Sequence, residues 1–173
     1  MPSRIQQNSI PLRKVQDFKS RISGGGARPN LFEVELAFPT AVSIDNDILS
    51  KARFLVKAAA LPASTVSPIE IPFRGRILKI AGDRTFETWT ITVMNDVDFS
   101  IRSAFEKWMN IINNVNDNTG IQDPEQYQSD AYVHQLDRDG GILRTYKFYD
   151  LFPTNVSAID LSYETTDTLE EFN

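Results

Sequence analysis

The chain has 173 residues, which is enough for one domain with a substantial hydrophobic core. Its net charge of −5 argues against a protein that grips nucleic-acid phosphates, although nucleic acid could still pass along an acidic wall. The absence of cysteine excludes disulfides, thiolate metal sites and a cysteine nucleophile. No apolar run approaches the roughly 20 residues that span a bilayer, and residues 1–8 lack the apolar core of a signal peptide. We therefore expect that the protein is made in the cytoplasm and does not insert into a membrane.

Residues 1–26 are predicted to form an N-terminal arm that precedes a domain at 27–173. Apolar side chains recur at helical spacing after Pro11, which predicts a short amphipathic helix. They are Leu12, Val15, Phe18 and Ile22. Gly24-Gly25-Gly26 then makes a flexible joint. The helix is either a disordered tail or a segment that docks on another surface, and composition does not separate the two.

Residues 31–58 predict two strands joined by a loop. Leu31–Phe38 alternates apolar residues with Glu33 and Glu35, which is typical of a strand with one buried face. Residues 39–50 are predicted to be the loop, and residues 53–58 the second strand. The acidic part of the loop is Asp45, Asn46 and Asp47.

The central part of the chain predicts a hairpin. Residues 61–73 contain three prolines, which exclude a central strand and favour an extended connection or a sheet edge. Residues 76–80 predict a third strand, and residues 88–93 alternate threonine with Trp89, Ile and Val as a fourth. Gly82-Asp83 supplies turn chemistry between them, so we expect these two strands to pair.

Residues 98–114 carry the pattern of an amphipathic helix. Its apolar stripe is Ile101, Phe105, Trp108, Met109 and Ile112. N-cap oxygens are available from Asn95, Asp96 and Asp98. Burial of Trp108 and Phe105 against a sheet would contribute about 2–3 kcal/mol each.

The C-terminal third predicts a loop at 113–128, then a second hairpin formed by residues 131–136 and 142–149. Residues 157–163 alternate again and predict a last strand. The predicted fold class is therefore mainly β, a β-barrel or sandwich of about seven or more strands with one packed α-helix.

No group of residues in the sequence forms a catalytic constellation. His134 lies mid-strand without a motif around it, so a structural or surface role is favoured. Gly24-Gly25-Gly26 lacks the Gly-Lys-Ser/Thr of a phosphate loop, and Asp45-Asn46-Asp47 lacks the glutamate of a calcium loop. We therefore expect no enzymatic activity, no metal and no cofactor.

The balance of strands and helix points instead to assembly. So few helical residues cannot cover so many strands, so the sheets should have open edges that are blunted or paired with another chain. Glu33 and Glu35, on the polar face of their strand, would then line a water-filled space. A monomeric, closed β-barrel that binds a ligand would give almost the same sequence pattern.

Five blocks of sequence occur in a recognisable order. They are Ala27–Glu35, Lys57–Ala63, Ala81–Phe86, Trp89–Asp96 and Phe152–Val156. Together they resemble the tail tube protein of T-even-like contractile-tailed bacteriophages across residues 27–163. Five separate matches are far more specific than one short motif.

The resemblance implies a barrel or sandwich with one packed helix, as in the related tubes of type VI secretion systems. It implies hexameric rings that stack into a hollow tube inside a contractile sheath, with baseplate tube proteins, the tape measure protein and transient DNA as partners. The loop at 39–50 would reach neighbouring subunits, and the arm and C-terminus would contact adjacent rings. The implied inter-subunit candidates are Leu12, Val15, Phe18, Ile22, Asp45, Asn46 and Asp47.

The sequence departs from the family in two places. The arm is longer and more basic, with Arg4, Arg13, Lys14, Lys19 and Arg21. The family continues into a last apolar strand where this sequence ends at Asn173, which implies an open edge in the barrel.

The sequence therefore predicts a structural subunit of a virion tail, assembled in the host cytoplasm, whose acidic lumen lets DNA slide through. Screening at physiological salt limits that repulsion to about 8 Å from the wall. The alternatives are a baseplate tube initiator or tube cap of the same fold, a tube subunit of a related contractile injection system, and the monomeric ligand-binding module.

Overall fold

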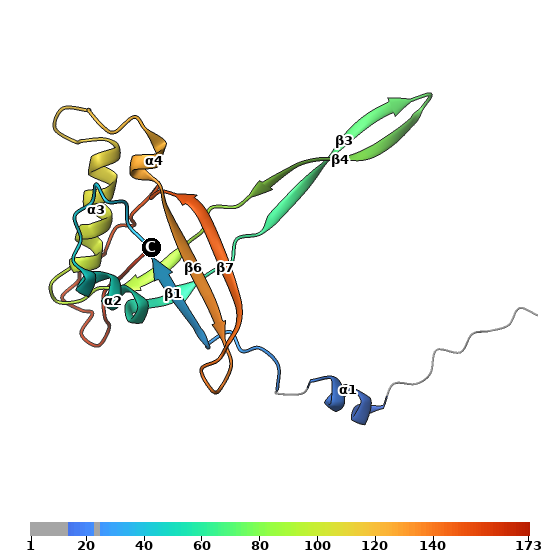
Figure 1. The fold of residues 1–173 in the computed structure, drawn as a ribbon, viewed down its shortest axis with the longest axis horizontal. Coiled ribbons are helices and arrows are strands. Elements are labelled where there is room, and N and C mark those ends of the chain that lie inside the picture. The colour runs from blue at the N-terminus through green and yellow to red at the C-terminus, as the bar shows by residue number, and fades with distance from the viewer. Residues whose placement is uncertain (1–13, 23–24) are drawn as a thin grey trace, which may run out of the picture.

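The computed structural model describes residues 14–22 and 25–173, and within them the fold is mixed α/β (Figure 1). Three small antiparallel sheets have the strand orders β1-β6-β7, β2-β5-β8 and β3-β4. The strands are β1 Phe32–Leu36, β2 Val56–Ala59, β3 Ser64–Phe73, β4 Arg76–Phe86, β5 Ile91–Met94, β6 Ser129–Leu136, β7 Ile142–Leu151 and β8 Glu171–Phe172. The helices are α1 Val15–Arg21, α2 Asn46–Leu55, α3 Ser100–Ile112 and α4 Pro124–Tyr127.

The predicted fold class is therefore right in its many antiparallel strands and wrong in two respects. The described residues form no closed barrel, and two helices, α2 and α4, are present in addition to the predicted arm helix α1 and the predicted packed helix α3. In the described part of the chain, no helix is long and apolar enough to cross a bilayer.

The hydrophobic core lies between the two three-stranded sheets and is covered by α2 and α3 (Figure 1). Val34 on β1, Val93 on β5 and Ile101 on α3 are almost completely buried. The alternation predicted for β1 is confirmed, because Val34 and Leu36 face the core while Glu33 and Glu35 face solvent. Val34 lies opposite Val133 of β6, which keeps both apolar faces on the same side of the sheet.

Helix α3 confirms the predicted amphipathic helix, with Ile101 and Trp108 buried. The N-cap residue of α3 is Phe99, which makes no side-chain cap hydrogen bond, and the carboxylate of Asp96 instead accepts hydrogen bonds from the Ser100 backbone N–H at 2.9 Å and the Ser100 hydroxyl at 2.7 Å. Desolvation raises the pKa of Asp96, but these hydrogen bonds and the charge of Lys51 outweigh it, so the pKa is lowered. The Trp108 indole N–H donates to the Tyr127 carbonyl at 2.6 Å, which fixes α4 against α3.

Helix α2 overturns the prediction of a loop at 39–50 followed by a strand at 53–58. The helix runs over Asn46–Leu55, and β2 begins only at Val56. The helix places Ile48, Ala52 and Leu55 on one side, where they pack into the core. Phe54 in the same helix is 81% exposed.

The predicted hairpin through Gly82-Asp83 is also wrong. Residue Gly82 lies inside β4, which pairs with β3 through a turn at Arg74-Gly75 with positive φ at both residues. A register shift between Val66 and Pro68 places Gly82 at a bulge. A Cβ atom there would lie 2.5 Å from the Ser67 carbonyl oxygen, so this position requires glycine.

Of the remaining strand predictions, two agree with the structure and one is wrong. The second hairpin is confirmed as β6 and β7, and residues 61–73 contain an edge strand, as the prolines indicated. Residues 157–163 do not form the predicted strand. The last strand is β8, which pairs with β5 and places Phe172 in the core at 3% exposure.

Candidate assembly surfaces

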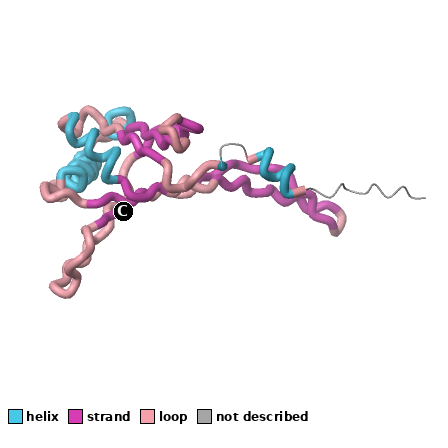
Figure 2. Tube along the Cα trace, turned by 90° about the horizontal axis from the view of Figure 1, so that it is seen from below, coloured by secondary structure: helices cyan, strands magenta, loops and turns pink. Residues whose placement is uncertain are grey.

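The β3–β4 ribbon projects from the body of the molecule as a long two-stranded arm (Figures 1 and 2). It is anchored to the body by backbone hydrogen bonds that continue the β2–β5 pairing. Ala60 N–H donates to the Thr90 carbonyl at 3.2 Å, and Glu87 N–H donates to the Ala63 carbonyl at 3.0 Å. The ribbon is therefore an outward extension of the core sheet.

The register divides the outer part of the ribbon into two faces, because residues directly opposite each other share a face. Ile69 lies opposite Ile80, and Ile71 lies opposite Leu78. We call the resulting surface the apolar face; its apolar members are Ile69, Ile71, Phe73, Leu78 and Ile80, and Arg76 lies on it opposite Phe73 at the tip. Each of the five apolar side chains is at least 42% exposed.

The opposite side of the ribbon, which we call the polar face, carries an exposed ion pair. Glu70 lies opposite Lys79, and the Lys79 ammonium is 3.0 Å from the Glu70 carboxylate. Pro68 and Pro72 flank this ion pair, opposite Ala81 and Ile77. The ribbon is thus amphipathic, with a contiguous apolar surface of the kind that marks an interaction site.

The apolar face was not predicted from the sequence alone. The apolar residues of β3 alternate with Pro68, Glu70 and Pro72, which is a period-two signal. The prolines left an extended connection and a sheet edge both open, so the sequence alone did not assign a strand face here.

The solvent face of β1 carries the predicted lumen residues Glu33 and Glu35. The Arg53 guanidinium lies 2.5 Å from the Glu35 carboxylate and 3.8 Å from that of Glu33. His134 of β6 lies 3.7 Å from Glu35 and shares a hydrogen bond of 2.9 Å with the Thr145 hydroxyl. The surface that these glutamates form is therefore not simply acidic, because a cation lies directly on it. Their position relative to a lumen stays a prediction.

The predicted arm helix is present as α1, with Val15, Phe18 and Ile22 all exposed. Leu12 lies outside the described residues. Helix α1 begins where the Lys14 backbone N–H donates to the Asp17 carboxylate at 3.1 Å. Its apolar stripe remains a predicted inter-subunit contact.

The predicted contact residues Asp45, Asn46 and Asp47 lie at the start of α2 rather than in a long loop. Asp47 pairs with Lys51 at 3.4 Å, and Lys51 also lies 3.6 Å from Asp96 before α3. This cluster ties the N-terminal ends of the two helices together. Its predicted contact with neighbouring subunits stays a prediction.

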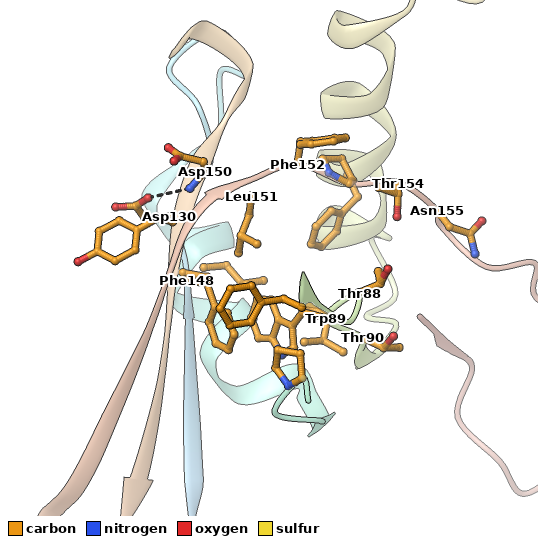
Figure 3. A pocket seen from close by; sticks show the side chains of 18 of the residues that line it. Thr88, Trp89, Thr90, Asp130, Phe148, Asp150, Leu151, Phe152, Thr154 and Asn155 are labelled. Atoms are coloured by element: carbon orange, nitrogen blue, oxygen red, sulfur yellow. Dashed lines mark hydrogen bonds between the residues drawn. The ribbon is translucent and has the colours of Figure 1, made fainter. Parts of the chain in front are cut away.

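A hollow of about 850 Å³ lies at the seam between the sheets, bordered by α3 and by the last residues of the sequence (Figure 3). Trp89 stacks on Phe148 inside it, with ring centroids 4.5 Å apart. Asp130 at its border is 2.8 Å from the Lys147 ammonium, and the hydrogen bond from Lys147 lowers the pKa of Asp130. An ionised, paired carboxylate is not a general acid, and the hollow is a mainly apolar packing seam.

The described residues contain no group of acidic and histidine side chains arranged to hold a metal ion. His134, the histidine noted in the sequence, is stacked against Tyr132 on the sheet surface. The features that stand out chemically are therefore surfaces for protein contact.

The sequence comparisons agree with this emphasis on protein contact. Residues 27–173 match a family model described as phage tail tube protein. The chain is 36% identical over 152 residues to tail tube protein gp19 of Enterobacteria phage T4, covering 87% of each chain, and equally similar to gp19 of phage T6. It is 27% identical over 161 residues to the tail tube protein of Serratia phage KSP90, covering 91% of this chain and 90% of the relative. The chain therefore belongs to the phage tail tube protein family, which is structural rather than enzymatic.

Proposed function

We propose that this protein is the subunit of a contractile phage tail tube, self-assembling into stacked hexameric rings that form a hollow conduit for DNA during ejection. The support is family membership together with the amphipathic ribbon. In this role the protein resides in the virion tail and assembles in the host cytoplasm. The sheath protein, baseplate tube proteins and tape measure protein are its partners.

The observation that carries the proposal is the exposed apolar face. A two-stranded ribbon is only marginally stable in water by itself, and an open edge is a template for another strand. This ribbon has ten residues in β3 and eleven in β4, and it displays large aliphatic and aromatic side chains to solvent. A neighbouring copy that covers the ribbon would stabilise it and would also occupy its open edge.

The prolines of β3 indicate which edge of the ribbon takes the next strand. Because proline has no N–H, the pairs at Pro68 and Pro72 are non-hydrogen-bonded pairs whose backbone groups point outward. The outer edge of β3 thus lacks two donors, whereas β4 keeps the outward N–H groups of Ile77, Lys79 and Ala81. We therefore assign inter-subunit strand pairing to β4.

Glu33 and Glu35 remain our proposed lumen residues on the body of the subunit. Arg53 balances one of the two carboxylates, so this surface keeps one net negative charge and is weakly rather than strongly repulsive. A weakly acidic, polar wall offers DNA phosphates neither a basic grip nor an apolar surface.

Negative-stain microscopy and sedimentation of the purified chain test the proposal. We expect hollow tubes or stacked rings at high protein concentration. A single ring that never stacks would indicate a baseplate initiator or a cap instead. A solitary monomer at high concentration, also in the presence of sheath protein and baseplates, would refute assembly.

A further inference from the structure

The division of the ribbon into two faces has a consequence for the inside of the assembled particle. We propose that the polar face with Glu70 and Lys79 lines the channel, while the apolar face packs outward against the body of the next copy. This inference rests on the proposed tube function and deepens it by assigning a side to each ribbon residue.

Strand pairing keeps the two faces of the ribbon separate in an assembly. When β strands pair edge to edge, side chains at equivalent positions stay on the same side of the sheet. If the β4 edge of each copy pairs with a different strand edge of the next copy, all apolar faces lie on one side of the joined sheet, and all Glu70–Lys79 pairs lie on the other. One side of a ring-shaped sheet faces the channel, and the other faces protein.

The two orientations of the ribbon differ in free energy. Ile71, Leu78 and Phe73 are between 42% and 65% exposed in the isolated chain. Turning them toward a water-filled channel would leave this surface hydrated, whereas packing it on a neighbour gains about 25 cal/mol per Å². The Glu70 and Lys79 side chains are 50% and 63% exposed, and burying this ion pair between proteins would cost desolvation. The polar face holds one large exposed apolar side chain, Ile77, against five on the apolar face, so both terms favour the same orientation.

The partner that covers the apolar face is a second copy of this chain. The ribbon projects beyond the core of its own chain (Figures 1 and 2), so its apolar face is not covered by the described residues of its own body. Every copy carries the same rigidly anchored ribbon through the bonds at Ala60 and Glu87. A repeated contact of this head-to-tail type generates rings when the rotation closes.

The orientation also gives the channel wall its charge. Each copy contributes one carboxylate and one ammonium 3.0 Å apart, so the ribbon surface is polar and neutral. Salt screens the residual dipoles within about one Debye length, roughly 8 Å at physiological ionic strength. A polyanion passing along this wall meets no fixed net charge.

The absence of native cysteine makes a labelling experiment direct. Two full-length variants, Glu70→Cys and Leu78→Cys, are each labelled with a small maleimide and with a long polyethylene glycol maleimide. Both reagents are applied to unassembled protein and to long assembled tubes. Unassembled protein is the control for intrinsic reactivity, and Lys79→Cys and Ile71→Cys are second probes of each face.

In tubes we expect position 70 to react with the small reagent at nearly its unassembled rate. Its reaction with the long reagent should fall at least tenfold, because only subunits at the tube ends are reached. Position 78 should become at least tenfold less reactive toward both reagents. Fast reaction of position 70 with the long reagent in tubes would place the polar face outside and overturn the inference.

Two further outcomes would also overturn it. Protection of position 70 from the small reagent would put the polar face in an interface, and full reactivity of position 78 in tubes would leave the apolar face uncovered. In each of these cases the tubes exist and the proposed function stands. Failure of the unmodified chain to form tubes or rings would instead overturn both proposals.

Discussion

Substitution of Ile71 by serine tests whether the apolar face holds the assembly together. Ile71 is 42% exposed in the isolated chain and lies opposite Leu78 in the centre of that face. Ile77 provides a matched control, because it is the same residue type on the polar face and is 60% exposed. Ile71→Ser and Ile77→Ser therefore remove similar side chains from opposite sides of one ribbon.

The magnitude follows from the surface that assembly would cover. An isoleucine side chain has about 180 Å² of accessible area in an extended chain, so 42% exposure leaves roughly 75 Å² to be buried by a neighbour. At about 25 cal/mol per Å² this burial contributes about 2 kcal/mol for each added copy. Because 1.4 kcal/mol corresponds to a factor of ten, Ile71→Ser should raise the critical assembly concentration by roughly 25-fold.

The assay is the critical concentration for tube formation, measured by pelleting tubes and quantifying the soluble protein. Circular dichroism melting of the unassembled variants checks that both remain folded. We expect Ile77→Ser to change the critical concentration by less than about threefold, since its side chain stays in water in the assembled state. Equal shifts for the two variants, or a larger shift for Ile77→Ser, would refute the assignment of the faces.

Three other perturbations have defined outcomes. Lys79→Pro removes an outward N–H from β4 and should abolish tube formation, whereas Lys79→Ala should assemble; assembly of both, seen by microscopy, would exclude β4 as the paired edge. Asp96→Ala removes the two hydrogen bonds to Ser100 at the start of α3 and should lower the free energy of unfolding by about 1 kcal/mol at neutral pH in denaturant titrations. Because folding lowers the pKa of Asp96, this contribution is complete above its ordinary value of 3.8 and is lost as the pH falls through the lower folded value; an undiminished difference in strong acid would contradict it. Deletion of residues 1–23 should impair ring stacking while the domain stays folded, and unchanged tubes would show that the arm makes no required contact.

Elements with a strong local pattern were predictable from the sequence. The alternation in β1 and the stripe that includes Ile101 and Trp108 in α3 depend only on spacing within one segment. Hairpin β6–β7 was found for the same reason, because the glycines at 140 and 141 separate two clear strand patterns.

Elements decided by tertiary packing were not predictable in this way. Residues 53–58 alternate like a strand, but Ala52 and Leu55 reach the core only if α2 continues through them. Gly82 has turn chemistry, yet its glycine is needed because the Ser67 carbonyl approaches closely at a bulge. A single sequence gives the residue type in such cases but not the neighbour that requires it.

The candidate surfaces show the same limit. Glu33 and Glu35 were correctly placed on a solvent face, but Arg53 was assigned to a strand, so its ion pairs with them were not foreseen. The apolar face needs the β3–β4 register, since its members are contributed by two strands joined at Arg74-Gly75. Assembly stays a prediction, and the part of the molecule that best fits it emerges only from the pairing.

The continuity of the ribbon with the β2–β5 pairing has a mechanical consequence. Antiparallel ladder bonds run perpendicular to the strands, so tension along the ribbon loads many of them in parallel as shear. The bonds at Ala60 and Glu87 pass that tension directly into strands that hold Val56 and Val93 in the core. A pulling force on the tip is therefore resisted by the hydrophobic core of the subunit, and the ribbon transmits this force instead of bending at its base.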